Sequence, residues 1–145
     1  MPDQVRQIEE IMRVNLRTTV AIGGPQRREQ SDYPVGALEQ LIRNALLHRT
    51  YDASTMPVKV YWYSNRIEIM NPGGLYGEVN PDTIWQNVTA YRNPLLAEGL
   101  KMLGVVERFG YGLTQACRAL EANGNPPLMT QFEPNYTLFK VEPAQ

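Results

Sequence analysis

Apolar residues recur at helical spacing in two segments near the N-terminus. The segments are residues 2–15 and residues 35–49, and the second is rich in good helix formers. Apolar side chains three and four residues apart share one face of an α-helix, so both segments are predicted to form amphipathic helices. Their apolar positions are Val5, Ile8, Met12, Leu16, Leu38, Leu41, Ile42, Ala45 and Leu46.

Alternation of apolar and polar residues identifies the predicted strands. Residues 58–62 and 67–70 alternate on either side of a short polar turn, which indicates a β-hairpin. Residues 128–132 and 136–141 give two further strands around a turn that contains proline. The second half of the chain is therefore expected to contribute at least one sheet.

Shorter elements are predicted between these segments. Residues 18–22 form a β-prone run that ends at Gly23 and Gly24, and residues 25–32 form either a loop or an edge strand. Gly104 is placed to end a helix. The remaining helices are expected at residues 81–87, 93–103 and 113–122.

The composition is that of one globular domain. A chain of 145 residues with a formal net charge of −1 is long enough for one core, and its charge gives no general attraction to nucleic acid. Direct binding to DNA is therefore not expected. Cys117 stands alone and is interpreted as a buried thiol. The absence of a signal region and of a membrane-length apolar run favours a cytoplasmic protein that does not contact the membrane.

Three polar residues of the 35–49 helix fall on one face. Gln40, Asn44 and His48 follow one another at intervals of four, so their side chains are neighbours. Asparagine is a poor helix former in a helix interior. Asn44 is therefore either solvent-facing by chance or retained for its side-chain carbonyl.

Two glycine-containing elements lie further along the chain. The sequence NPGG at residues 71–74 directly follows a predicted strand and is expected to form a tight loop. The sequence GYG at residues 110–112 opens a predicted helix, where free backbone N–H groups can hold phosphate oxygens. The alternative is an ordinary turn followed by a helix cap.

The order of these elements resembles the Bergerat ATP-binding fold, the GHKL class of gyrases, heat-shock chaperones, histidine kinases and mismatch-repair proteins. The sequences LIRNALLHRTY, RIEIMNPGGL, YRNPLLAEGL and ERFGYGL resemble more closely the divergent GHKL domain of bacterial and archaeal proteins related to RecG helicase, some described as transcriptional regulators. The resemblance implies an α+β fold: a two-layer sandwich of a mixed β-sheet with helices on one face. It assigns residues 33–145 to this domain and residues 1–32 to a helix and connecting segment left from an inter-domain region.

The resemblance also implies roles for individual residues. Asn44 matches the asparagine that helps to hold Mg²⁺ at the nucleotide phosphates, since hard cations prefer oxygen ligands. Asn71 falls near the expected adenine, and Gly73 and Gly74 leave room for the base. In the second glycine motif, Gly110 and Gly112 flank Tyr111 at the phosphates.

Two further residues have open roles under the resemblance. His48 either approaches the nucleotide or closes the C-terminus of its helix. Arg92 either reaches the phosphates or pairs with a carboxylate.

The chain departs from the GHKL pattern at the residue that activates water. The family commonly has glutamate four residues before the magnesium asparagine, whereas this chain has Gln40, and an amide cannot take up a proton at neutral pH. Glu39 is a poor substitute because one residue turns the side chain by about 100° around the helix. ATP hydrolysis is therefore expected to be weak or absent.

The resulting functional hypothesis is an ATP-binding regulatory domain, with ATP and Mg²⁺ as its ligands. The alternatives are a slow Mg²⁺-dependent ATPase and a degenerate scaffold that dimerises or docks DNA-binding domains. Expected partners are other domains of a longer protein, of Schlafen/AlbA-like or winged-helix type, and a second copy of the chain in a homodimer. No GxxxxGK[ST] loop is present, so helicase activity by this chain alone is not expected.

Overall fold

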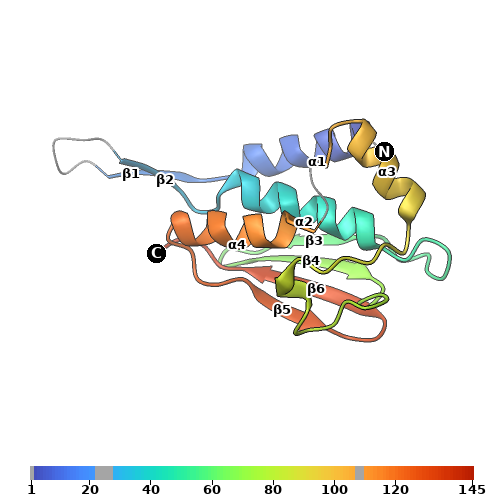
Figure 1. The fold of residues 1–145 in the computed structure, drawn as a ribbon. Helices are drawn as coiled ribbons and strands as arrows, with labels where there is room; N and C mark the ends of the chain where they lie inside the picture. The colour runs from blue at the N-terminus through green and yellow to red at the C-terminus, as the bar shows by residue number, and fades with distance from the viewer. Residues whose placement is uncertain (1, 22–27, 107–109) are drawn as a thin grey trace.

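The computed structural model describes residues 2–21, 28–106 and 110–145. Within them a four-stranded sheet is covered on one face by helices (Figure 1). In chain order the elements are α1 (Pro2–Asn15), β1 (Thr18–Ala21), β2 (Arg28–Ser31), α2 (Val35–His48), β3 (Lys59–Trp62), β4 (Ile67–Pro72), the 3-10 helix η1 (Ile84–Gln86), α3 (Pro94–Met102), α4 (Gly112–Ala122), β5 (Met129–Phe132) and β6 (Tyr136–Val141). The predicted α+β two-layer sandwich is confirmed.

The sheet has the strand order β3-β4-β6-β5, and every pairing in it is antiparallel. The expectation of a mixed sheet is thus corrected. Two hairpins account for the result: Tyr63 N donates to Arg66 O at 2.9 Å between β3 and β4, and Glu133 N donates to Tyr136 O at 3.0 Å between β5 and β6. The hairpins meet along β4 and β6, where Ile67 pairs with Val141 and Asn71 pairs with Thr137.

The main core lies between the sheet and the helices α2 and α4. β4 and β6 direct fully buried side chains such as Ile69 and Phe139 to this face, and α2 directs Leu38 and Leu41 onto them. Each such side chain contributes about 1.5–3 kcal/mol through removal of its apolar surface from water. Small residues, with Ala37, Ala45 and Ala116 all fully buried, allow α2 and α4 to pack closely.

The helix α1 packs on α2 and contributes Met12 to the same core. An ion pair between Arg43 and Glu9, at 2.9 Å, joins the two helices. β1 and β2 form a separate antiparallel hairpin that lies outside the main sheet (Figure 1). For the described part of the 25–32 segment, β2 (Arg28–Ser31) decides in favour of a strand, while residues 22–27, with Gly23 and Gly24, lie outside the described residues.

A smaller cluster joins α3 to the C-terminal end of α2. It consists of the buried residues Leu47, Ala97 and Leu100. The helix α3 has Pro94 in its first turn, where the missing N–H of proline costs nothing. Gly104 follows the end of α3 with a positive φ of 69°. No helix among the described residues is long and apolar enough to cross a membrane.

The predicted helix and strand positions are confirmed, with two differences. The segment predicted as a helix at residues 81–87 contains only the single turn of η1. The expected loop at residues 71–74 begins later, because Asn71 and Pro72 are still paired in β4. Cys117, predicted to be buried, is partly buried on α4, and burial raises the pKa of its thiol.

Candidate functional site

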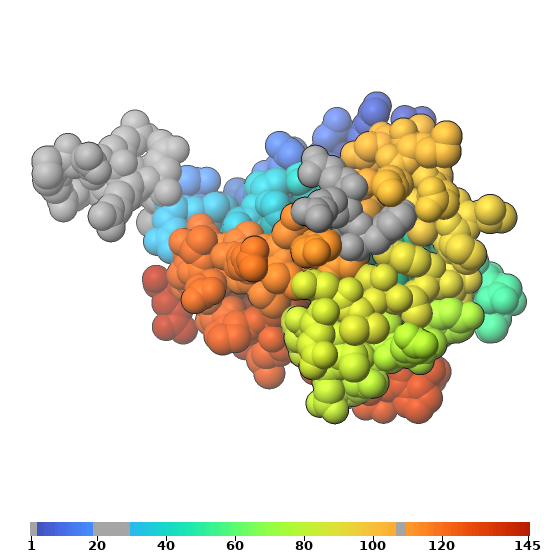
Figure 2. Space-filling model, in the orientation of Figure 1, coloured from blue at the N-terminus to red at the C-terminus, as the bar shows by residue number. Residues whose placement is uncertain are grey.

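A cavity of about 100 Å³ lies between α2, the ends of β4 and β6, and the start of α4. The segment that links β4 to α3, here called the crossing segment, contributes much of the pocket lining, and in Figure 2 it lies at the surface beside α4 and below α3. Its polar lining includes Gln40, Arg43, Asn44, His48, Asn71, Thr89, Tyr91 and Thr137. Its apolar lining includes Leu75, Val79, Ile84, Val88, Leu113 and Phe139.

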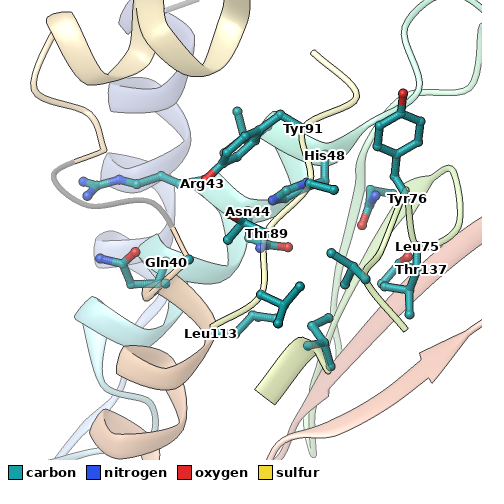
Figure 3. A pocket seen from close by; sticks show the side chains of 18 of the residues that line it. Gln40, Arg43, Asn44, His48, Leu75, Tyr76, Thr89, Tyr91, Leu113 and Thr137 are labelled. Carbon is teal, nitrogen blue, oxygen red and sulfur yellow. The ribbon is translucent and has the colours of Figure 1, made fainter. Parts of the chain in front are cut away.

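The polar face of α2 forms one wall of this pocket. Gln40, Asn44 and His48 all line it, as their spacing predicts, and they project from successive turns of the helix (Figure 3). Asn44 therefore faces the pocket, which decides against the solvent-facing interpretation. Its side-chain amide is part of the pocket wall.

His48 packs face to face on Tyr91, which comes from the segment that crosses the pocket. The ring centroids are 5.6 Å apart and the planes differ by 15°. Burial of the imidazole, followed by the positive charge of Arg92, lowers the pKa of His48 to about 4. His48 is therefore neutral near pH 7 and presents one donor and one acceptor nitrogen.

Asn71 is the most deeply buried polar residue of the site. It lies near the end of β4, its exposed fraction is 2%, and its Oδ1 has no hydrogen-bond donor within the described part of the chain. Opposite it on β6, Thr137 Oγ1 donates a hydrogen bond to Gly73 O at 3.1 Å. The pocket thus contains a buried acceptor that no described residue satisfies and that a ligand or a water molecule could satisfy.

The two glycines after β4 are required by close packing of the backbone. Gly73 has a φ of 103°, and a Cβ atom there would collide with the side chain of Thr50. A Cβ atom on Gly74 would come within 2.5 Å of Glu133 O. Gly74 lines the pocket, whereas Gly73 supports it from behind, against Thr50 and the β5–β6 turn.

The second glycine motif forms the opposite end of the pocket. Gly110 and Gly112 both line it, and Gly112 lies close to Gln40, since a Cβ atom there would be 3.2 Å from Gln40 Oε1. Gly110 has a φ of 82° and packs directly against Thr89, so this turn supports the segment that crosses the pocket. Tyr111 is 38% exposed and points outside the lining.

Arg92 and Asn93 fix the crossing segment to the rest of the domain. Arg92 Nη2 donates to Gly74 O at 3.1 Å, and its guanidinium lies 4.7 Å from the ring centroid of Tyr76. Asn93 Nδ2 donates to the carbonyls of Leu47 and Arg49 at 3.1 and 2.7 Å, which caps the C-terminus of α2. Arg92 thus contacts backbone and aromatic groups beside the pocket and does not line it.

Glu39 points away from the pocket. Its carboxylate accepts from Arg13 at 2.5 Å and lies 3.8 Å from Arg43, on the side of α2 that faces α1. Gln40, by contrast, lines the pocket. The amide of Gln40, and not the neighbouring carboxylate, therefore lies in the pocket wall with Asn44.

Several lining residues are not identifiable from the sequence. Thr137 reaches the pocket only through the pairing of β4 with β6, and Tyr91 reaches it because the crossing segment is anchored at Asn93. Thr137 carries no motif, whereas Tyr91 opens the sequence YRNPLLAEGL but has no role assigned from it. The signal for Thr137 is its position in a predicted strand, and the pairing of that strand with β4 sets it opposite Asn71.

Comparisons with known proteins identify a family and a fold. Residues 55–141 match the family described as "Putative ATP-dependent DNA helicase recG C-terminal". A comparison with curated protein sequences finds no match. Among solved structures, the DIP2311 protein from Corynebacterium diphtheriae is similar in fold, with a TM-score of 0.87 and 20% sequence identity. The likeness covers 99% of this chain and 29% of that one, so this chain spans less than a third of the length of its structural relative.

Proposed function

Because the chain belongs to this ATPase-like family of RecG C-terminal domains, we propose that its pocket binds an adenine nucleotide and that its fold is of the GHKL type. The observation that carries the proposal is Asn71. A buried acceptor without a partner costs about 1–3 kcal/mol, and Asn71 Oδ1 is such an acceptor in the pocket wall. The exocyclic amine of adenine is a donor of the right kind to satisfy it.

The size of the cavity determines how a nucleotide would enter. A volume of about 100 Å³ is comparable to a purine base and far below the roughly 300–1,000 Å³ of typical ligand pockets. The base would therefore occupy the enclosed part, between Leu75 and Phe139. The phosphates would extend toward Asn44 and Gly110, and the segment that contains Thr89 would have to shift to admit them.

Asn44 is the residue suited to a magnesium ion. Its side-chain oxygen is a hard ligand at the pocket wall, but the described residues contain no group of three His, Cys, Asp or Glu side chains that would hold a metal by themselves. Mg²⁺ would accordingly enter together with the nucleotide phosphates, which supply the anionic oxygens. Bound there, it would neutralise phosphate charge.

Binding with little hydrolysis is the activity that these residues support best. Gln40 can orient a water molecule but cannot take its proton, and Glu39 is engaged by Arg13 on another face of the helix. We therefore propose a regulatory role, in which nucleotide occupancy changes the state of a longer protein. Domains of the Schlafen/AlbA-like or winged-helix type would be the partners that respond.

A titration followed by amide chemical shifts tests the proposal. ATP and ADP, each with and without Mg²⁺, should shift the resonances of Asn44, Asn71 and Gly110 and leave those of α1 unchanged. The variant Asn71→Ala should lose the response. Asn65→Ala is the matched control, because Asn65 lies in the exposed turn between β3 and β4. No shift at millimolar ATP would refute nucleotide binding and favour the scaffold.

A further inference from the structure

We propose that the pocket accepts guanine as well as adenine nucleotides, because Asn71 presents an amide to the edge of the base. The inference rests on the proposed function, that the pocket holds a nucleotide base. It goes further by naming purine nucleotides as the ligand class and Asn71 as the residue that sets it.

An amide can match positions 6 and 1 of either purine, because it carries both a donor and an acceptor. The Asn71 side chain carries an acceptor oxygen and a donor nitrogen. Adenine presents an amine donor next to a ring-nitrogen acceptor, and guanine presents a carbonyl acceptor next to a ring N–H donor. Rotation of the amide by 180° exchanges its two groups and matches the other base. At these two positions an ionised aspartate meets the adenine amine but opposes the guanine carbonyl. It suits guanine only one position further along the edge, where the ring N–H and the 2-amino group both donate.

The structure leaves the Asn71 amide free to make this rotation. The backbone of Asn71 is fixed by its pairing with Thr137, but no described donor holds Oδ1. The amides of two other asparagines differ: Asn93 Nδ2 donates to the carbonyls of Leu47 and Arg49, and Asn125 Nδ2 donates to those of Asp32 and Glu142. Those two orientations are locked. The terminal torsion of asparagine is broad, so Asn71 can adopt either orientation at little cost.

Thr137 supplies the second feature that guanine requires. It lies directly opposite Asn71, and paired residues on neighbouring strands place their Cβ atoms about 4.5–5.5 Å apart on one face of the sheet. Because the hydroxyl hydrogen of Thr137 is donated to Gly73 O, only the oxygen lone pairs remain for a ligand. The 2-amino group of guanine can donate to this oxygen, whereas adenine has only a C–H bond at that position.

The other walls of the enclosed part do not discriminate between purines. Leu75, Val79, Ile84 and Phe139 are apolar and contact the faces of a planar base. Apolar contact is worth about the same for adenine and guanine, since it depends on buried area. The preference between adenine and guanine therefore depends on the polar atoms of Asn71 and Thr137, and these atoms can bind either base.

Parallel titrations with Mg²⁺ and ATP, ITP or GTP test the inference, with the amide shifts of residues 71–74 as the measure of binding in the pocket. ITP has the carbonyl and ring N–H of guanine without its 2-amino group. Wild-type affinities for the three nucleotides should agree within about tenfold. The variant N71D should keep ATP binding and weaken ITP binding by roughly ten- to a hundredfold, the range expected for loss of a bidentate base contact. ITP is the informative nucleotide for N71D, because the 2-amino group and ring N–H of GTP can both donate to a carboxylate.

The outcomes separate the inference from the proposed function. If ATP binds and both ITP and GTP bind more than a hundredfold more weakly, nucleotide binding stands and the inference is overturned. If none of the three shifts residues 71–74, both are overturned. If N71D does not fold, the wild-type series decides alone. If N71D weakens all three nucleotides equally, Asn71 does not read the edge of the base and the inference fails.

Discussion

Lowering the pH should destabilise this domain through one side chain, His48, the single histidine of the sequence. In the folded chain its imidazole is buried against Tyr91 with Arg92 nearby, and its pKa is lowered to about 4. In the unfolded chain the pKa is the ordinary 6.5. The unfolded state therefore binds more protons between these two values, and acid favours unfolding.

The size of the effect follows from the two pKa values. The contribution of His48 to stability is complete above pH 6.5, falls as the pH is lowered, and is fully lost below about pH 4. One pKa unit corresponds to about 1.4 kcal/mol, so the total loss is about 3 kcal/mol and the loss between pH 7 and pH 5 is about 2 kcal/mol. That is a substantial part of the roughly 5–15 kcal/mol that stabilises a typical domain.

Urea unfolding at pH 7 and pH 5 measures this loss, with His48→Gln as the control. Glutamine does not titrate, and every other titratable group is common to both proteins, so their contributions cancel in the comparison. The variant also loses the stacking on Tyr91, which lowers its stability equally at both pH values. The wild type should lose about 2 kcal/mol more than the variant between pH 7 and pH 5.

Parallel pH profiles for the two proteins would refute the reasoning. They would mean that the imidazole titrates alike in the folded and unfolded chains. An imidazole chemical shift that changes with a midpoint near pH 6.5 in the folded protein would lead to the same conclusion, and would place His48 in contact with solvent.

Three further predictions concern the pocket and its supports. Gln40→Glu should raise the rate of phosphate release from Mg-ATP by up to about 10²–10⁴-fold above a negligible wild-type rate, whereas Glu39→Gln should leave that rate unchanged. Robust wild-type hydrolysis that is lost in Glu39→Gln would instead make Glu39 the general base. Asn44→Ala should weaken ATP binding in calorimetry more with Mg²⁺ than without it, and an equal loss would argue against a metal ligand. Gly110→Ala should lower the free energy of unfolding in urea by about 1–3 kcal/mol more than Gly104→Ala does. Both glycines have a positive φ, but only Gly110 packs against Thr89, so equal losses of stability would exclude that contact.

The helices and hairpins could be predicted because their signals are local. The stripe that contains Leu38 and Leu41 sets the face of α2, and the alternation that contains Ile67 and Ile69 sets the face of β4. The order of strands in the sheet has no comparable signal. It depends on pairing between β4 and β6, which are separated by more than sixty residues, so the antiparallel sheet was not predictable from periodicity.

The candidate site likewise contains some residues that the sequence could place and others that it could not. Gln40, Asn44 and His48 could be placed together because helical spacing fixes their relation. Thr137 could not, because only the register of two distant strands sets it opposite Asn71. Gly73 illustrates a different difficulty, since a glycine after a strand suits a nucleotide loop and close packing equally well. Here its neighbour is Thr50, which the sequence does not indicate.

The most direct test of the central claim is a crystal structure of the chain with Mg²⁺ and a non-hydrolysable ATP analogue. The purine should lie in the pocket beside Leu75, with its amine nitrogen within about 2.7–3.2 Å of Asn71 Oδ1 and its phosphates directed to Asn44 and Gly110. A base bound elsewhere on the chain, with Asn71 Oδ1 still without a ligand donor, would contradict it.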